Sequence, residues 1–186
     1  FGTVDNVLGG SASYFSTAAS FFTEVSLVGV IGDDFPSGAL DLFREREINI
    51  DGLERVQGQT FRWKGEYGYD LNEAVTLDTQ LNVFEHFPPR LPSTYAESPY
   101  VFLANIDPEL QLEVLTQVKR PKFVACDTMN FWIESRRPEL IELLGKVDAI
   151  TPNDAEARQL TENNNLVKAA KWIMGLGPKF VIIKKG

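Results

Sequence analysis

Two side chains that can take part in chemistry, an amide and a carboxylate, stand three residues apart in this sequence. They are Asn153 and Glu156, in the stretch Thr151-Pro152-Asn153-Asp154-Ala155-Glu156. If Asn153 is the N-cap of a helix, Glu156 stands at N3 and can bond back to the cap N–H, so a capping box explains the spacing. At the end of a strand, the same carboxylate can hold Mg²⁺ through water. The spacing alone leaves both interpretations open.

A pair of glycines, Gly9-Gly10, precedes a helix of small residues around positions 16–19. Adjacent glycines let a ligand approach the backbone closely, and a helix N-terminus offers free N–H groups to hydroxyls or anions. Paired glycines are also common in turns, so a plain turn before a tightly packed helix is the simpler interpretation of this stretch alone.

Residues 28–38 read as a strand that runs into a loop and then a helix, with Asp33 and Asp34 in the loop. The stretch lacks Gly-x-Gly-x-x-Gly, so it is not a dinucleotide-binding fingerprint. A strand exit shaped by the two aspartates, with Ser37 near the next N-cap, explains it without a ligand.

Composition excludes several function classes. The 186 residues include 18 Lys and Arg against 26 Asp and Glu, for a net charge of −8. A composition of 44 % hydrophobic and 24 % charged residues is typical of a globular protein. The acidic balance argues against a nucleic-acid partner. The single cysteine, Cys126, ends an apolar run and is expected to be buried and inert. With one histidine, His86, and no Gly-x-Ser-x-Gly elbow, neither a structural zinc site nor a Ser-His-Asp mechanism is supported.

No apolar stretch approaches the length of a membrane span, and the first residues show no signal-peptide pattern. We therefore expect a cytoplasmic protein without a membrane partner. The sequence begins without Met and ends directly after an expected strand, which predicts a fragment cut at both ends.

Five short apolar runs predict the strands that position these residues. They are rich in Val, Ile and Phe without alternation, as in strands covered on both faces, and occupy residues 25–30, 100–104, 122–126, 147–150 and 179–183. Helical patterns follow the N-cap Asp107, begin at Pro138, follow Asn153 and cover residues 166–174. This alternation predicts an α/β fold, a Rossmann-like and mostly parallel sheet flanked by helices.

Residues 60–85 do not follow this alternation of strands and helices. Apolar and polar residues alternate there, and no helix of any length intervenes. The pattern predicts a small antiparallel β flap with one face buried. Its apolar positions are Phe61, Trp63, Tyr67, Tyr69, Leu81, Val83 and Phe84.

Taken together and in order, these stretches resemble the ribokinase-like (PfkB) carbohydrate kinases over most of the chain. The similar stretches are Gly9-Gly10 (the family's substrate-binding di-glycine), residues 28–38 (its second signature), residues 48–53 with Thr60 (where its β lid begins), Asp127-Thr128-Met129-Asn130 (its Asp-x-x-Asn stretch) and Asn153-x-x-Glu156 (its Asn-x-x-Glu motif, tied to Mg²⁺ and phosphate).

The resemblance implies transfer of the γ-phosphoryl group of ATP to a primary hydroxyl of a sugar, with ATP and Mg²⁺ as cofactors. It implies an α/β core of residues 13–57 and 87–186 and a β lid of residues 1–12 and 58–86. The implied substrate contacts are Gly9, Gly10, Tyr14 and Asn105. The implied nucleotide contacts are Asn153, Glu156, Lys184 and Gly186, with Glu156 also reaching Mg²⁺ through water.

Two departures from the family pattern shape the alternatives. Tyr14 stands where many sugar kinases have an Asn. Since aromatic rings stack on bases, this departure keeps a nucleoside kinase as an alternative. The Gly-Ala-Gly-Asp segment that carries the family's catalytic base is expected after Gly186, so we expect these 186 residues alone to be inactive. A non-catalytic sugar- or nucleotide-binding domain is the alternative from another class.

The aromatic residues of the flap allow two further roles by the same resemblance. A β lid can close over substrate and exclude water. An exposed aromatic face can also pair the lids of two subunits, which would make the protein a homodimer.

Overall fold

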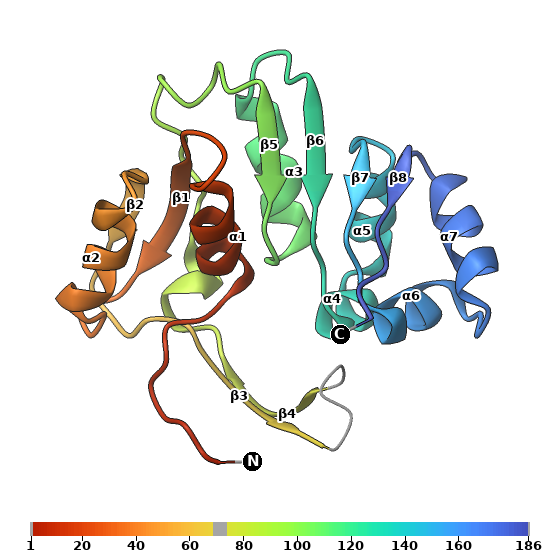
Figure 1. The fold of residues 1–186 in the computed structure, drawn as a ribbon, viewed down its shortest axis with the longest axis horizontal. Coiled ribbons are helices and arrows are strands. Elements are labelled where there is room, and N and C mark those ends of the chain that lie inside the picture. The colour runs from red at the N-terminus through yellow and green to blue at the C-terminus, as the bar shows by residue number, and fades with distance from the viewer. Residues whose placement is uncertain (1, 69–73, 186) are drawn as a thin grey trace. The chain divides into compact units, whose positions relative to one another are not determined.

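A computed structural model describes residues 2–68 and 74–185 of the chain (Figure 1). The chain forms two compact units, the first of residues 1–61 and 81–87 and the second of residues 62–80 and 88–186. The division into a core and a lid stays a prediction. Within the described ranges, no helix is long and apolar enough to cross a bilayer.

The first unit is built around two parallel strands, β1 (Ser26–Ile31) and β2 (Asn49–Arg55), with Val28 opposite Gly52. The helix α2 (Ser37–Glu45) connects them, as a parallel pair requires. A small core of Leu27, Phe43 and Ile48 fills the unit. The unit also contains α1 (Ser11–Ala19) and the 3₁₀ helix η1 (Asn82–His86). The apolar pattern did not predict β2, because most of its residues are polar.

The loop after β1 is tied to the chain that follows β2. The carboxylate of Asp34 accepts hydrogen bonds from both the N–H and the hydroxyl of Thr60, each at 2.7 Å. The Thr60 hydroxyl also accepts a bond from the Gly32 N–H at 3.0 Å. A Cβ atom at Gly32 would overlap the carbonyl oxygen of Gly58, so this close backbone approach requires glycine.

The second unit contains a parallel sheet in the strand order β5-β6-β7-β8 (Figure 1). Its strands are β5 (Tyr100–Leu103), β6 (Phe123–Cys126), β7 (Ala149–Ile150) and β8 (Phe180–Val181). The helices between and beside them are α3 (Pro108–Gln117), α4 (Asn130–Ser135), α5 (Arg137–Leu144), α6 (Asp154–Thr161) and α7 (Leu166–Met174). The predicted α/β architecture with a parallel sheet is therefore confirmed.

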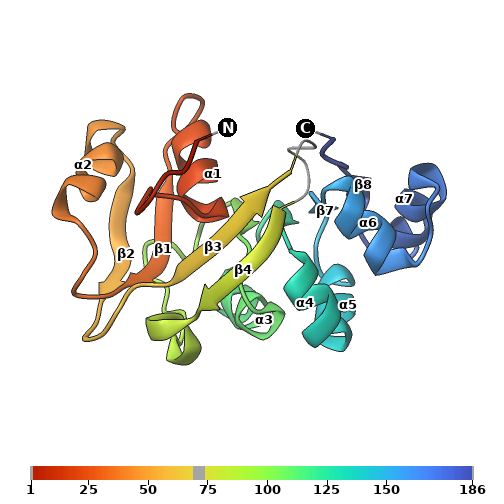
Figure 2. The ribbon, with the colours of Figure 1, turned by 90° about the horizontal axis from the view of Figure 1, so that it is seen from below.

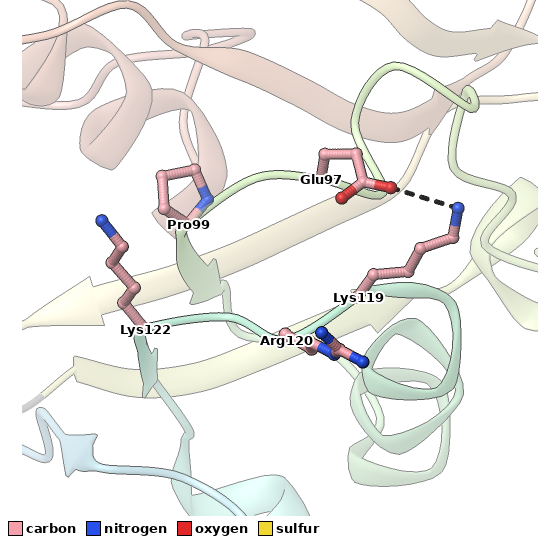
Figure 3. A pocket seen from close by; sticks show the side chains of 5 residues that line it. All are labelled: Glu97, Pro99, Lys119, Arg120 and Lys122. Carbon is pink, nitrogen blue, oxygen red and sulfur yellow. Dashed lines mark hydrogen bonds and ion pairs between the residues drawn. The ribbon is translucent and has the colours of Figure 1, made fainter.

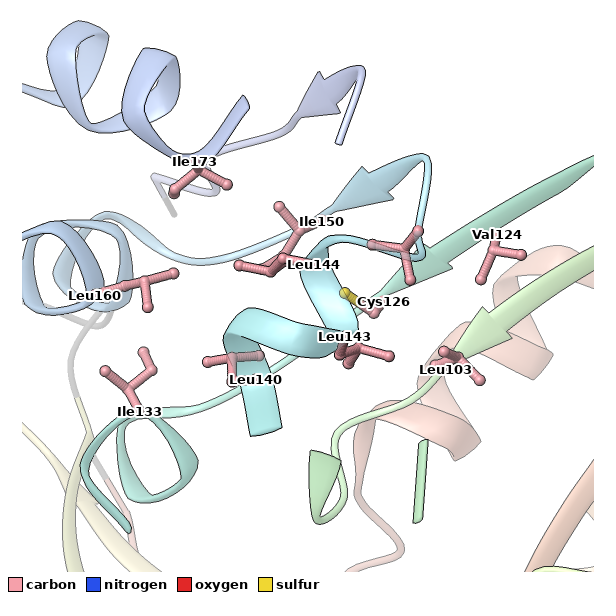
Figure 4. Packing of buried hydrophobic residues seen from close by; sticks show 11 residues of the cluster. Leu103, Val124, Cys126, Ile133, Leu140, Leu143, Leu144, Ile150, Leu160 and Ile173 are labelled. Carbon is pink, nitrogen blue, oxygen red and sulfur yellow. The ribbon is translucent and has the colours of Figure 1, made fainter. Parts of the chain in front are cut away.

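The hydrophobic core of this unit lies between the sheet and its helices (Figure 4). Leu140, Leu143 and Leu144 of α5 meet Ile150 of β7 there, and all four are fully buried. Cys126 is fully buried in the same cluster, and burial raises the pKa of its thiol well above the ordinary value. The expectation of a buried cysteine is confirmed, and its inertness stays a prediction.

The helix α3 begins at the cap that the sequence predicts, whereas the cap of α7 was not predicted. Asp107 accepts a hydrogen bond from the N–H of Glu109 at 2.9 Å, and Pro108 occupies the first turn of α3. Asn165 caps α7 by accepting bonds from the N–H groups of Val167 and Lys168. These short-range bonds satisfy N–H groups in the first turn of each helix.

The flap contains one antiparallel pair, β3 (Arg62–Tyr67) and β4 (Ala74–Gln80), as predicted (Figure 2). The expected buried face is wrong for the described residues, because Trp63 and Tyr67 are exposed. The Trp63 indole lies over Gly65, where a Cβ would overlap it, and its Nε1–H donates to the Thr76 hydroxyl at 3.1 Å. These two contacts hold the indole on the ribbon without a core beneath it.

Four other apolar positions of the flap differ from the strand pattern. Val83 and Phe84 lie in η1, and Leu81 is its N-cap. Phe61 and Phe84 pack on each other in the first unit, with ring centroids 5.2 Å apart. Tyr69 lies outside the described residues.

Candidate functional site

Polar side chains follow the ends of the parallel strands in the second unit. Asn105 lies two residues after β5, Asp127 and Thr151 come directly after β6 and β7, and Lys184 lies three residues after β8. Parallel strands of one sheet end at the same edge, and ligands of open α/β sheets bind outside that carboxyl edge. These residues define the candidate site.

The capping box at the start of α6 is present. The Glu156 carboxylate accepts a hydrogen bond from the Asn153 N–H, and the Asn153 side-chain oxygen accepts one from the Glu156 N–H, both at 2.7 Å. Lys184 runs alongside, where its N–H donates to the Pro152 carbonyl and its carbonyl accepts from the Asp154 N–H. The structure therefore brings together Asn153, Glu156 and Lys184, three of the predicted nucleotide contacts.

Lys184 also forms an ion pair that the sequence pattern did not identify. Its Nζ lies 3.0 Å from Oδ1 of Asp127, and the Thr151 hydroxyl donates to the same oxygen at 3.2 Å. The Asp127 side chain is 11 % exposed, whereas that of Lys184 is 48 % exposed. The lysine thus has a buried anchor and an accessible ammonium group. The resemblance of residues 127–130 to the family's Asp-x-x-Asn stretch pointed to Asp127 but not to its pair with Lys184.

Glu156 has an unusual electrostatic environment. Burial raises its pKa to about 7, although the Asn153 N–H and the nearby Lys184 ammonium act in the opposite direction, and Asp127 adds to the increase. A bound cation would favour the ionised carboxylate and reverse the effect of burial.

The residues at this edge fit Mg²⁺ only as a partly hydrated ion. The described residues contain no group of three or more Asp, Glu, His or Cys side chains that could enclose a metal. Mg²⁺ commonly keeps several waters and is held by one or two carboxylates together with substrate phosphates. Glu156, with one oxygen on the Asn153 N–H, matches that donor set through a water molecule.

The predicted substrate contacts Gly9, Gly10 and Tyr14 lie together in the first unit. Gly10 is the N-cap of α1 with φ 93°, a conformation that L side chains rarely adopt. The Tyr14 N–H donates to the Gly10 carbonyl, and its hydroxyl approaches Gly9. Tyr14 is exposed, so its ring is accessible to a ligand. The predicted nucleotide contact Gly186 lies outside the described residues.

Gln111 of α3 is a residue that sequence reasoning missed. It is 1 % exposed, and its side-chain Nε2 contacts the carbonyl oxygens of Leu103, Ala104 and Asp127 at 2.9 to 3.1 Å. No sequence pattern distinguishes a glutamine on an amphipathic helix from an ordinary solvent-facing one.

A hollow lies at the opposite edge of the sheet from the candidate site (Figure 3). It is lined by Glu97, Pro99, Lys119, Arg120 and Lys122, which precede β5 and β6. Lys119 and Glu97 form an ion pair of 3.2 Å there, with both side chains 68 % exposed. An exposed pair of this kind contributes little, and none of the predicted site residues lines the hollow.

The fold and the polar carboxyl edge define a ribokinase-like α/β protein, and solved structures of that class match over nearly the whole chain. The sequence model of the pfkB family carbohydrate kinases matches residues 2–186, and the chain belongs to this family.

A cytidine kinase of Thermococcus kodakarensis is 29 % identical over 183 residues, which cover 96 % of this chain and 64 % of that protein. An Escherichia coli protein assigned as ribokinase II, solved with ATP and Mg²⁺, has a TM-score of 0.73 at 14 % identity, over 95 % of this chain and 61 % of its own. The nucleoside kinase of Methanocaldococcus jannaschii has a TM-score of 0.68 at 18 % identity, over 96 % and 58 %. The chain thus spans less than two thirds of each of these relatives.

Proposed function

We propose that the chain is part of a kinase that transfers the γ-phosphoryl group of ATP to a primary hydroxyl of a pentose, either free or within a nucleoside. The observation that carries the proposal is the linked set at the carboxyl edge of the sheet. There the Asn153–Glu156 capping box lies beside the Lys184–Asp127 ion pair. Family membership and the ATP and Mg²⁺ bound by the E. coli relative support the cofactors. A cytoplasmic location, where ATP is available, belongs to the same proposal.

Each of the three nucleotide-side residues has a distinct role in this proposal. Mg²⁺, when bound, neutralises charge on the phosphates. Glu156 holds that ion through water, and the Asn153 N–H keeps its carboxylate oriented. Lys184 offers its accessible ammonium to a phosphate oxygen while Asp127 restrains the side chain. We also include Gly186 as a nucleotide contact.

A nucleoside is the favoured form of the acceptor. Two relatives carry names for nucleoside-type substrates, a cytidine kinase and a nucleoside kinase. The exposed ring of Tyr14 next to the Gly9-Gly10 turn supplies a surface on which a base can stack. We retain Asn105 as the acceptor contact from the second unit.

The catalytic base is not among these residues in the proposal. The resemblance implies that a Gly-Ala-Gly-Asp stretch supplies the base, and the 186 residues contain no such stretch. We therefore propose that the chain binds ligands but does not turn over by itself. The β3–β4 pair, with Trp63 and Tyr67 exposed, is proposed as the lid and as the contact between copies in a homodimer.

The test is an ATP-dependent phosphorylation assay with cytidine, adenosine and ribose as acceptors. It compares these 186 residues with a longer natural sequence that continues into Gly-Ala-Gly-Asp. We expect turnover with the longer protein and none with the 186 residues. Turnover by the 186 residues would contradict the assignment of the base. Ligand binding without turnover by the longer protein would support the non-catalytic binding domain instead. A monomeric mass by light scattering would contradict the homodimer.

A further inference from the structure

The Gln111 side chain lies where β5 and β6 separate. The last backbone bond between the strand ends runs from the Asp127 N–H to the Leu103 carbonyl, at 2.9 Å. Beyond it, Nε2 of Gln111 takes over and contacts Leu103 at 3.1 Å, Ala104 at 2.9 Å and Asp127 at 3.0 Å. One buried amide thus joins the exits of two neighbouring strands.

The contact with three carbonyl groups requires a hydrogen-bond donor at position 111. Buried carbonyl groups need hydrogen-bond partners, and the Ala104 and Asp127 carbonyls lie beyond the last backbone bond between the two strands. A glutamine amide provides two N–H donors without bringing a charge into the interior. Its Oε1 is buried and has no hydrogen-bond partner among the described residues, so the donor side alone accounts for the polar side chain.

Both strand exits lead directly into the candidate site. Ala104 precedes Asn105, the proposed acceptor contact, and the carbonyl of Asp127 belongs to the residue that pairs with Lys184. Gln111 lies behind these residues and bonds only backbone carbonyl groups. It can act on the site only through the positions of Asn105 and Asp127.

We propose that Gln111 is a positioning residue, which holds the Ala104 and Asp127 carbonyls together and so sets the separation between Asn105 and the Asp127–Lys184 pair. Its effect on ligand affinity rests on the proposed function, whereas its effect on the strand exits does not. An effect of this kind needs a control with the same chemistry at another place on the helix.

The chain contains such a control in Gln117, on the same helix. Its Nε2 donates to the Pro89 carbonyl at 2.7 Å, and its Oε1 accepts from the Leu91 N–H at 3.0 Å. Gln117→Met therefore removes an amide that bonds to the backbone, as Gln111→Met does. The backbone that Gln117 contacts is not a strand exit. Gln111→Asn, which keeps the donors on a shorter side chain, replaces Gln111→Met if the latter fails to fold.

Cys126 reports on the strand exit, because it is the only cysteine in the sequence, is fully buried and precedes Asp127. The experiment measures the rate at which a thiol reagent labels Cys126 in the native chain. It also measures the affinity for cytidine by calorimetry. We expect Gln111→Met to label about tenfold faster than wild type and to bind cytidine about tenfold more weakly. Gln117→Met should change both values less than about twofold.

Equal labelling rates in the two variants would overturn the proposal. Faster labelling of Gln111→Met with unchanged cytidine affinity would also overturn it, because the exit would open without moving the site. If wild type does not bind cytidine, the nucleoside acceptor fails, and the labelling rates alone then decide the role of Gln111.

Discussion

The ammonium group of Lys184 lies 3.0 Å from a carboxylate oxygen of Asp127, a residue 57 positions earlier in the chain. The pair joins the exit of β6 to the segment that follows β8, which lies next to β7 in the sheet. The same lysine runs beside the capping box that holds Glu156. The Lys184–Asp127 contact therefore connects the exit of β6 to the capping box in the proposed nucleotide site.

This ion pair should be worth more than an exposed one. We expect a double-mutant cycle of Asp127→Asn and Lys184→Met to give a coupling free energy of about 1–2 kcal/mol, because Asp127 is largely buried. The exposed Lys119–Glu97 pair is the control, with an expected coupling below about 0.5 kcal/mol. Urea unfolding measures both cycles, and equal couplings would show that the buried anchor adds nothing.

Glu156 should make the stability of the chain depend on pH. Its pKa is raised from 4.5 to about 7 in the folded state, so the folded chain holds this proton more tightly than the unfolded chain does. That contribution is complete below about pH 4.5 and is lost as the pH rises through 7. Relative to Glu156→Gln, wild type should lose about 2–3 kcal/mol of unfolding free energy between pH 5 and pH 8. Parallel pH profiles of the two proteins would contradict this.

Asp148 should have the opposite pH dependence. The Lys179 ammonium and the Val124 N–H lower its pKa, so its contribution is present above the ordinary pKa and is lost as the pH falls through the lowered value. Asp148→Asn should cost about 1 kcal/mol at pH 7 and less near pH 3. Asp41→Asn, which removes an exposed helical pair with Arg44, is the control and should be nearly neutral. A cost for Asp148→Asn that does not change with pH would count against the ion pair.

Two glycines of the second signature should respond differently to alanine. At Gly32 the added Cβ would overlap the Gly58 carbonyl, so we expect Gly32→Ala to cost about 2–4 kcal/mol. At Gly38, in the first turn of α2, nothing lies within 4 Å, and Gly38→Ala should be neutral or stabilise by up to about 1 kcal/mol. Thermal unfolding compares the two variants. A tolerated Gly32→Ala would show that the loop shifts easily away from residues 58–60.

Local features of this chain could be predicted, since short-range chemistry determines them. The runs of Val, Ile and Phe predicted the strands of the parallel sheet, and the caps Asp107 and Asn153 predicted two helix starts. The capping box was one of two interpretations of Asn153 and Glu156. Its presence is compatible with the metal interpretation, because it uses only one carboxylate oxygen.

Contacts between distant segments could not be predicted. Gln111 looks like an ordinary polar residue until the strands beside it are placed, and the motif around Asp127 did not predict its ion pair with Lys184. The prediction of a buried face on the flap was also wrong. Alternation of polar and apolar residues indicates two unlike faces, but not whether a core covers either of them. Trp63 alternates as a buried residue would, yet it rests on Gly65 of its own strand.

The most direct test of the central claim is calorimetric titration of the chain with a hydrolysis-resistant ATP analogue and Mg²⁺. Glu156→Gln should weaken binding by about tenfold or more, because the ion loses its charged partner. Glu162→Gln changes the net charge equally at the exposed end of the same helix and should leave the affinity within about twofold. Equal affinities for wild type and Glu156→Gln, or no binding by wild type, would contradict a nucleotide site at this edge of the sheet.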